Sequence, residues 1–335
     1  MWPSVAQAFR MLLARQHSFH ARSYQAILAA NPRRRPYHME HIFHLYVLWN
    51  IHSSLSLPIS TRRQWDIYFM TDESTRLLEA MIAAAREAGA GLAEDHARAN
   101  TLDIRRKSGA DFYSEADLRA ESTVRRVLGV AAPTFGFLGE EGGLVAGEDP
   151  DTTWIVDPLD GTTNFLRGTA LFAVNIALEQ HGEIAAAVTY VPLMNELFHA
   201  QKNRGAFLNG TRIHVSKSQG IDDAVLAVGI PFGGKPRQEY FLREMRRLMP
   251  KVAGVRRLGA GAIDSAWVAA GRFDAYWEQS VSPWDMAAGA LLISEAGGVV
   301  SDTAGRALDI RGGTFLGCTP AIHETLLEAL APECA

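Results

Sequence analysis

The chain contains 335 residues, of which 47% are hydrophobic and 21% charged, and its formal net charge is −4. This composition can fill a hydrophobic core and excludes a chain that is disordered throughout. The two cysteines, Cys318 and Cys334, are too few for a disulfide framework or a cysteine-based zinc site, so a reducing cytoplasm is the expected location.

The first 69 residues differ in charge from the rest. They hold eight arginines, no lysine and two acidic residues, a net of +6, which leaves −10 for residues 70–335. Their apolar stretch, residues 42–57, is interrupted by His44, Asn50 and His52 and is too short to span a bilayer. Since no small-residue cleavage site follows an apolar run there, we expect no ordinary signal peptide. We expect residues 1–69 to be an extension that is disordered or lies upstream of a start at Met70, with a targeting arm and an accessory segment as alternatives.

Residues 70–215 predict a mixed α+β half. Apolar residues three and four apart predict helices over about residues 73–94 and 114–128. Apolar runs predict strands at residues 135–138, 153–156, 171–179, 183–190, 196–200 and 205–208. His181-Gly182 and Asn209-Gly210 are typical of hairpin turns between such strands.

Residues 216–335 alternate between the two kinds of element. Strands are predicted at residues 224–229, 254–258 and 274–278, and helices at residues 238–249, 262–270 and 284–296. This alternation indicates an α/β half that completes the same molecule. The net acidic charge of residues 70–335 disfavours direct binding to nucleic acid.

Six acidic side chains stand at junctions between these elements: Asp117, Glu140, Glu141, Asp157, Asp160 and Asp285. Most acidic residues only solubilise a surface, but these lie at the ends of strands or the starts of helices. Buried carboxylates need a partner or a cation to offset their desolvation. Because hard divalent cations prefer oxygen ligands, the pattern predicts a metal site.

Two of these acids belong to the segment Asp157-Pro158-Leu159-Asp160-Gly161-Thr162-Thr163-Asn164. Its Gly-Thr-Thr portion can open a helix whose free N–H groups point at an anion. Metal ligands beside an anion site indicate a metal-dependent phosphate-ester hydrolase.

Three segments now resemble one known family. In order and spacing they are similar to the signatures of the inositol monophosphatase family. The segments are Glu140-Glu141, Asp157 to Phe165, and Trp284-Asp285-Met286-Ala287-Ala288-Gly289. The similarity covers about residues 74–330. It implies an α/β fold in which α and β layers alternate as an α-β-α-β-α sandwich. The metals would lie in a cleft between the α+β half and the α/β half. It also implies Mg²⁺ as cofactor, sensitivity to lithium and a homodimer.

The resemblance implies a set of metal ligands. Glu140, Asp157 and the backbone carbonyl of Leu159 would hold a first Mg²⁺, and Asp157, Asp160 and Asp285 a second. A looser third ion would lie near Glu140 and Asp117. Bound in this way, the cations would clamp a phosphate and activate a water.

The resemblance also implies catalytic and substrate-binding residues. Glu140, Asp157 and Thr162 would be catalytic, with Thr162 and Glu140 positioning the water. Gly161, Thr162 and Thr163 would donate hydrogen bonds to phosphate oxygens. The residues matching those that contact a polyol are Asp160, Glu278, Asp285 and the backbone at Gly259, Ala260 and Gly261. Asp264, one helical turn further along, is expected to be structural.

Thr163-Asn164-Phe165 is typical of the branch that acts on inositol 1-phosphate. Histidinol phosphate, fructose 1,6-bisphosphate and 3′-phosphoadenosine 5′-phosphate remain alternative substrates. An alternative of another class is an accessory partner in the transcription of ribosomal RNA, because bacterial relatives are known in that role; it would act through a protein partner.

Overall fold

The computed structural model describes residues 59–98, 104–108, 111–231 and 237–331. The chain divides into two units, Met1–Tyr68 and Phe69–Ala335. The predictions for the N-terminal extension fall largely on residues 1–58, outside those described. Helix α3 (Ile59–His96) has no break at Met70, so this helix starts earlier than the predicted residue 73.

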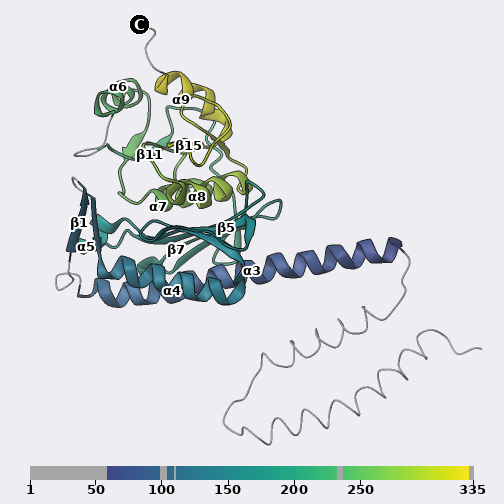
Figure 1. Cartoon of the computed structure of the whole chain (residues 1–335). Helices are drawn as coiled ribbons and strands as arrows, with labels where there is room; N and C mark the ends of the chain where they lie inside the picture. The colour runs from purple at the N-terminus through teal and green to yellow at the C-terminus, as the bar shows by residue number, and fades with distance from the viewer. Residues whose placement is uncertain (1–58, 99–103, 109–110, 232–236, 332–335) are drawn as a thin grey trace, which may run out of the picture. The chain divides into compact units, whose positions relative to one another are not determined.

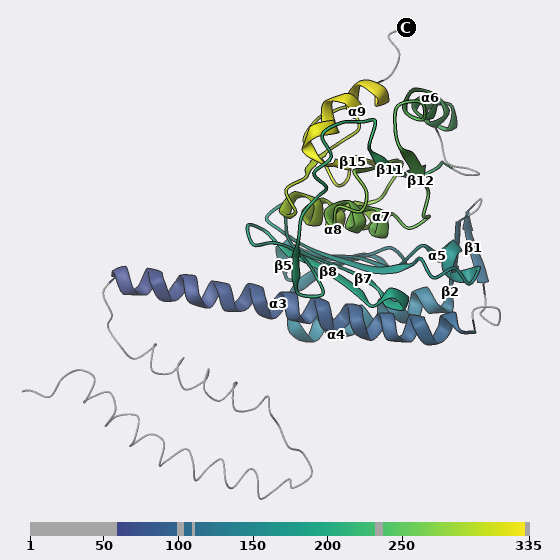
Figure 2. The same cartoon turned by 180° about the vertical axis from the view of Figure 1, so that it is seen from behind.

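The second unit is built in five layers, as the resemblance implied (Figure 1). Helices α3 and α4 (Glu115–Ala131) cover one face of an eight-stranded sheet. Helices α7 (Gly261–Ala269) and α8 (Pro283–Glu295) cover its other face and separate it from a five-stranded sheet. Helices α6 (Gln238–Leu248) and α9 (His323–Leu330) form the outer layer, which the reverse view also shows (Figure 2).

The eight-stranded sheet has the order β10-β9-β8-β7-β6-β5-β3-β4. Its strands are β3 (Phe135–Gly139), β4 (Gly143–Val145), β5 (Asp149–Asp160), β6 (Ala173–Gln180), β7 (Glu183–Val191), β8 (Glu196–Gln201), β9 (Gly205–Leu208) and β10 (Thr211–Ile213). Within this sheet, β3 and β5 pair in parallel and the other neighbouring strands pair antiparallel. The predicted hairpins at His181-Gly182 and Asn209-Gly210 are confirmed by the β6–β7 and β9–β10 pairs.

The five-stranded sheet has the order β12-β11-β13-β15-β14. Its strands are β11 (Val225–Val228), β12 (Gly254–Arg256), β13 (Ala275–Gln279), β14 (Val299–Ser301) and β15 (Thr314–Cys318). Strand β11 runs parallel to β12 and β13, whereas β15 is antiparallel to β13 and β14. The last two strands are not predicted from the sequence, because each is short and lies in a Gly-rich stretch.

Smaller elements lie outside these layers. A two-stranded ribbon pairs β1 (Ile104–Ser108) with β2 (Asp111–Ser114), and the short helix α5 (Thr162–Leu166) follows β5. None of the helices in the described parts of the chain has the length and apolarity needed to cross a bilayer. The layers bury three apolar clusters. One lies between α3 and α4 and the eight-stranded sheet, one surrounds α7 and α8 and reaches both sheets, and one lies between the five-stranded sheet and α6 and α9.

Candidate metal and phosphate site

Twelve of the thirteen predicted site residues line one pocket of about 150 Å³. They are Glu140, Asp157, Leu159, Asp160, Gly161, Thr162, Thr163, Gly259, Ala260, Gly261, Glu278 and Asp285. They come from the end of β3, the end of β5, the starts of α5, α7 and α8, and strand β13. The remaining predicted residue, Asp117, lies behind this pocket.

Strand β5 presents Asp157 and Asp160 through an irregular end. The pairing with β6 shifts register between these two residues, so the backbone departs from the regular ladder where the acids begin. The Leu159 N–H donates to Oδ1 of Asp157 at 2.9 Å. This local hydrogen bond fixes a carboxylate that is 2% exposed.

Asp160 links strand β5 to helix α7. Its Oδ2 accepts a hydrogen bond from the Ala262 N–H, in the first turn of α7, at 2.8 Å. Burial, helped by the charges of Glu278 and Glu140, raises the pKa of Asp160 to about 7, although backbone hydrogen bonds to its carboxylate act in the opposite direction. The end of one sheet is thereby fixed to a helix that covers the other.

Asp285 belongs to the first turn of α8. Its Oδ2 accepts from the backbone N–H of Ser282, the N-cap residue, at 2.7 Å. Asn175 of β6 donates to the carbonyl of Trp284 at 2.8 Å and ties this turn to the eight-stranded sheet. Burial raises the pKa of Asp285 well above its usual range, and the Glu140 and Asp160 charges act in the same direction.

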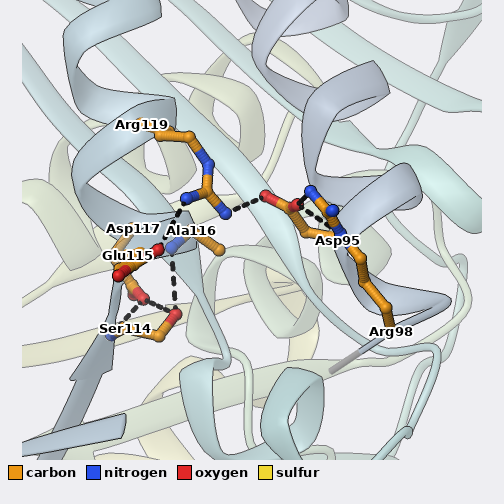
Figure 3. A network of polar contacts seen from close by, with 7 residues as sticks. All are labelled: Asp95, Arg98, Ser114, Glu115, Ala116, Asp117 and Arg119. Atoms are coloured by element: carbon orange, nitrogen blue, oxygen red, sulfur yellow. Dashed lines mark hydrogen bonds and ion pairs between the residues drawn. The ribbon is translucent and has the colours of Figure 1, made fainter. Parts of the chain in front are cut away.

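Asp117 belongs to the capping box at the start of α4, and it contacts the pocket residue Thr162. It accepts hydrogen bonds from the Ser114 N–H at 2.7 Å and the Ser114 hydroxyl at 2.8 Å (Figure 3). The hydroxyl of Thr162 lies 3.2 Å from its Oδ1. Beside it, Arg119 joins Glu115 to Asp95 of α3. Asp117 is 1% exposed, so the structure places it next to Thr162 but not on the pocket surface.

A positive phi angle at Gly161 directs the chain from β5 into α5. Its φ is 90°, and a Cβ there would lie 2.8 Å from the Leu171 carbonyl oxygen. A side chain would therefore be strained both by conformation and by contact. Asn164 fixes the far side of α5 by donating to the carbonyls of Leu171 and Leu258, each at 2.8 Å.

The donor set of the pocket fits a hard divalent cation. Among the described residues, no three His, Cys, Asp or Glu side chains are gathered closely enough to hold an ion as they stand. The acids nevertheless repel one another: after burial, the charges of Glu140, Asp160 and Asp285 raise the pKa of Asp157. A bound cation would offset this repulsion, and carboxylate and carbonyl oxygens are the ligands that Mg²⁺ prefers.

Three polar residues of the pocket wall were not predicted to bind substrate: Arg257, Asp264 and Tyr276. Asp264, expected to be structural, is 2% exposed, and its Oδ1 has no hydrogen-bond partner among the described residues. Tyr276 lies two residues before Glu278, on the same face of β13. That spacing is a sequence signal that could have placed Tyr276 beside the predicted polyol site.

The profile of the inositol monophosphatase family matches residues 73–334. The chain belongs to the inositol monophosphatase family. It is 49% identical to an inositol-1-monophosphatase of Caulobacter vibrioides over 253 residues, 75% of this chain and 99% of that relative. It is 40% identical to the Nus factor SuhB of Pseudomonas aeruginosa over 260 residues, 76% of this chain and 96% of that protein.

The fold agrees with solved structures of similar chains. The extragenic suppressor protein suhB from Bartonella henselae superimposes with a TM-score of 0.74 at 43% identity, covering 76% of this chain and 98% of that one. The layered α/β arrangement expected from the resemblance is thus confirmed.

Proposed function

We propose that this protein is a Mg²⁺-dependent phosphomonoesterase that hydrolyses inositol 1-phosphate to inositol and phosphate. The convergence of Glu140, Asp157, Asp160 and Asp285 on one pocket carries the proposal, because these four acids come from three separate parts of the fold: the end of β3, strand β5 and the start of α8. The relatives named inositol-1-monophosphatase, 44 to 49% identical, support the choice of substrate.

The metal ligands follow the resemblance. Glu140, Asp157 and the Leu159 carbonyl would hold one Mg²⁺. Asp157, Asp160 and Asp285 would hold a second ion, and Glu140 and Asp117 would hold a third ion more loosely. Bound divalent cations polarise the phosphoryl group, lower the pKa of a water and neutralise the leaving alkoxide.

Thr162 is suited to orient the attacking water. Its hydroxyl hydrogen is directed at two acceptors, the Leu159 carbonyl at 3.1 Å and Asp117 Oδ1 at 3.2 Å. The Thr162 oxygen can therefore accept a hydrogen bond from a water, and Glu140 on the same pocket wall can accept another. A water that donates both hydrogen bonds would keep its lone pairs free to attack phosphorus. Gly161, Thr162 and Thr163 would donate to the phosphate oxygens.

The polyol would be held by Asp160, Glu278, Asp285 and the backbone of residues 259–261. These groups accept and donate hydrogen bonds to hydroxyls. Histidinol phosphate, fructose 1,6-bisphosphate and 3′-phosphoadenosine 5′-phosphate remain the alternatives for this site.

A panel of these four substrates tests the proposal. Phosphate release is measured with Mg²⁺ and with chelator, on the full chain. We expect release that depends on Mg²⁺, is inhibited by lithium and is fastest with inositol 1-phosphate. Slowest turnover of inositol 1-phosphate would overturn the substrate, and undiminished release in chelator would overturn the metal dependence.

Relatives at 37 to 40% identity named Nus factor SuhB favour a second candidate, a binding role in a transcription complex. The two roles separate in an Asp157→Asn variant, since binding to a protein partner does not need turnover. Capture of transcription proteins from extract by wild type but not by this variant would tie binding to the active site.

We also propose a cytoplasmic homodimer, which the cysteine content and the resemblance support.

A further inference from the structure

One wall of the pocket is formed by a hydrogen-bonded pair on β13. The hydroxyl of Tyr276 donates to Oε2 of Glu278 at 2.6 Å. Both residues line the pocket, and Tyr276 is 2% exposed. The two side chains lie on the same face of the strand because they are two residues apart.

Two glycines make room for this pair. A Cβ on Gly261 would lie 2.5 Å from the Tyr276 hydroxyl oxygen, and a Cβ on Gly229 would overlap the carboxylate of Glu278. Both side-chain ends are therefore seated directly against backbone. Larger residues at either glycine would displace one member of the pair.

The other face of β13 is hydrogen-bonded to helix α6. Trp277 donates from Nε1 to Oε2 of the buried Glu244 at 3.1 Å, and Gln279 donates to Oε1 of the same carboxylate. Glu244 lies on α6, so the residues on both sides of Glu278 are fixed to the outer helix layer. The strand offers the Tyr276–Glu278 pair a rigid base.

Glu278 is surrounded by like charge. Its carboxylate raises the pKa of Asp160, Asp264 and Asp285, after the larger effect of burial on each of the three groups. The same repulsion acts on Glu278 and favours any rotamer that moves its charge away from these acids. Burial, followed by the charge of Glu278, raises the pKa of Tyr276 well above its usual range, so the phenol keeps the proton that it donates.

We propose that Tyr276 is a positioning residue that fixes Glu278 for a polyol hydroxyl and thereby sets the preference for polyol phosphates over esters whose leaving group carries no hydroxyl. This inference rests on the proposed phosphatase function. Tyr276 acts through Glu278 and touches none of the reacting atoms. The substrate class is a phosphate monoester with a hydroxyl that reaches β13 while its phosphate lies at the start of α5.

The test compares inositol 1-phosphate with phenyl phosphate, which has no hydroxyl on its leaving group. The readout is the ratio of the two kcat/KM values at saturating Mg²⁺. In Tyr276→Phe we expect this ratio to fall about tenfold, mainly through KM for inositol 1-phosphate, as for a lost hydrogen bond to a charged group. Tyr190→Phe, the same change on β7, is the matched control and should keep the wild-type ratio.

A double-mutant cycle distinguishes positioning from a merely structural role. If Tyr276 acts through Glu278, the Tyr276→Phe/Glu278→Gln double variant has the ratio of Glu278→Gln alone. Additive effects, or an equal loss on both substrates in Tyr276→Phe, would overturn the inference. Should Tyr276→Phe not fold, Gly261→Ala displaces the phenol and must lower the same ratio. A wild-type enzyme that releases phosphate from neither ester contradicts the proposed function itself.

Discussion

At the scale of single residues, the environment of Asp157 shows how the pocket holds its acids. Asp157 is buried, accepts from the Leu159 N–H at 2.9 Å and faces the charges of Glu140, Asp160 and Asp285. An Asn side chain keeps the shape and this hydrogen bond but removes the charge that a cation requires.

We therefore expect Asp157→Asn and Asp285→Asn each to lower kcat by about a thousandfold or more, because the metal clamp is lost. Phosphate release from inositol 1-phosphate at saturating Mg²⁺ measures the effect. Asp151→Asn changes an exposed acid on the same strand as Asp157 and should retain full turnover. If both pocket variants keep a tenth of the wild-type kcat, the ligand assignment is wrong.

Residue types and spacing were sufficient to predict the acids, but not every wall of the pocket. Asp157, Asp160 and the Gly-Thr-Thr turn are contiguous, so one octapeptide contained both chemistries. Asp264 had no such signal, because it lies in an apolar run where a single acid is ordinarily a core residue. Tyr276 had only its two-residue spacing from Glu278, in a run where an aromatic is ordinarily a core residue. Their place in the pocket depends on how α7 packs beside β13, and that contact is long-range.

At the scale of elements, the first turns of two helices each supply an acid at or next to the pocket. Asp117 and Asp285 both occupy the third position of a helix, where each accepts from the N-cap backbone, at Ser114 for α4 and Ser282 for α8. The acid that caps the helix also faces, or stands behind, the pocket. The capping pattern before α4 was visible in the sequence. The short strands β1, β2, β14 and β15 were not, because their pairing partners, not their own residues, stabilise them.

Removing the cap of α4 gives the element-scale prediction. Ser114 donates to Asp117 at 2.8 Å and accepts from the Ala116 N–H at 3.2 Å. We expect Ser114→Ala to lower the free energy of unfolding by about 1 to 2 kcal/mol. Thermal unfolding, followed by circular dichroism, measures this change as a drop in Tm of a few degrees.

Ser265→Ala is the control for that experiment. The Ser265 hydroxyl is also fully buried, but it has no hydrogen-bond partner among the described residues. Its removal should therefore leave Tm unchanged or raise it slightly. Equal destabilisation by Ser114→Ala and Ser265→Ala would show that volume, and not the cap, governs the loss.

At the scale of the whole unit, the pocket is where two sheets meet through shared helices. Strand β5 belongs to the eight-stranded sheet and β13 to the five-stranded one, and α7 and α8 lie between them. The layers therefore concentrate negative charge at the contact between the two halves of the chain. Folding without a cation must work against that repulsion, so the stability of the unit should depend on pH and on Mg²⁺.

Asp160 sets the sign of this dependence. Its pKa rises from 3.8 to about 7 in the folded protein, so between these values the folded state binds more protons than the unfolded state. Stability without metal therefore falls as pH rises through this window. Asp160→Asn has no proton to lose. In chelator, we expect its Tm to exceed that of wild type by about 5 °C at pH 7.5 and to match it near pH 4.

Excess Mg²⁺ should reverse this order at pH 7.5, because an ion that binds only the folded state raises the Tm of the protein that retains its ligands. Asp151→Asn again serves as the control, since its exposed carboxylate lies outside the pocket and should follow wild type at every pH. Calorimetric melting of the three proteins across pH 4 to 7.5, with chelator and with Mg²⁺, provides the comparison. Equal melting temperatures of wild type and Asp160→Asn in chelator at pH 7.5 would mean that the acids of the two halves do not repel one another in the folded unit.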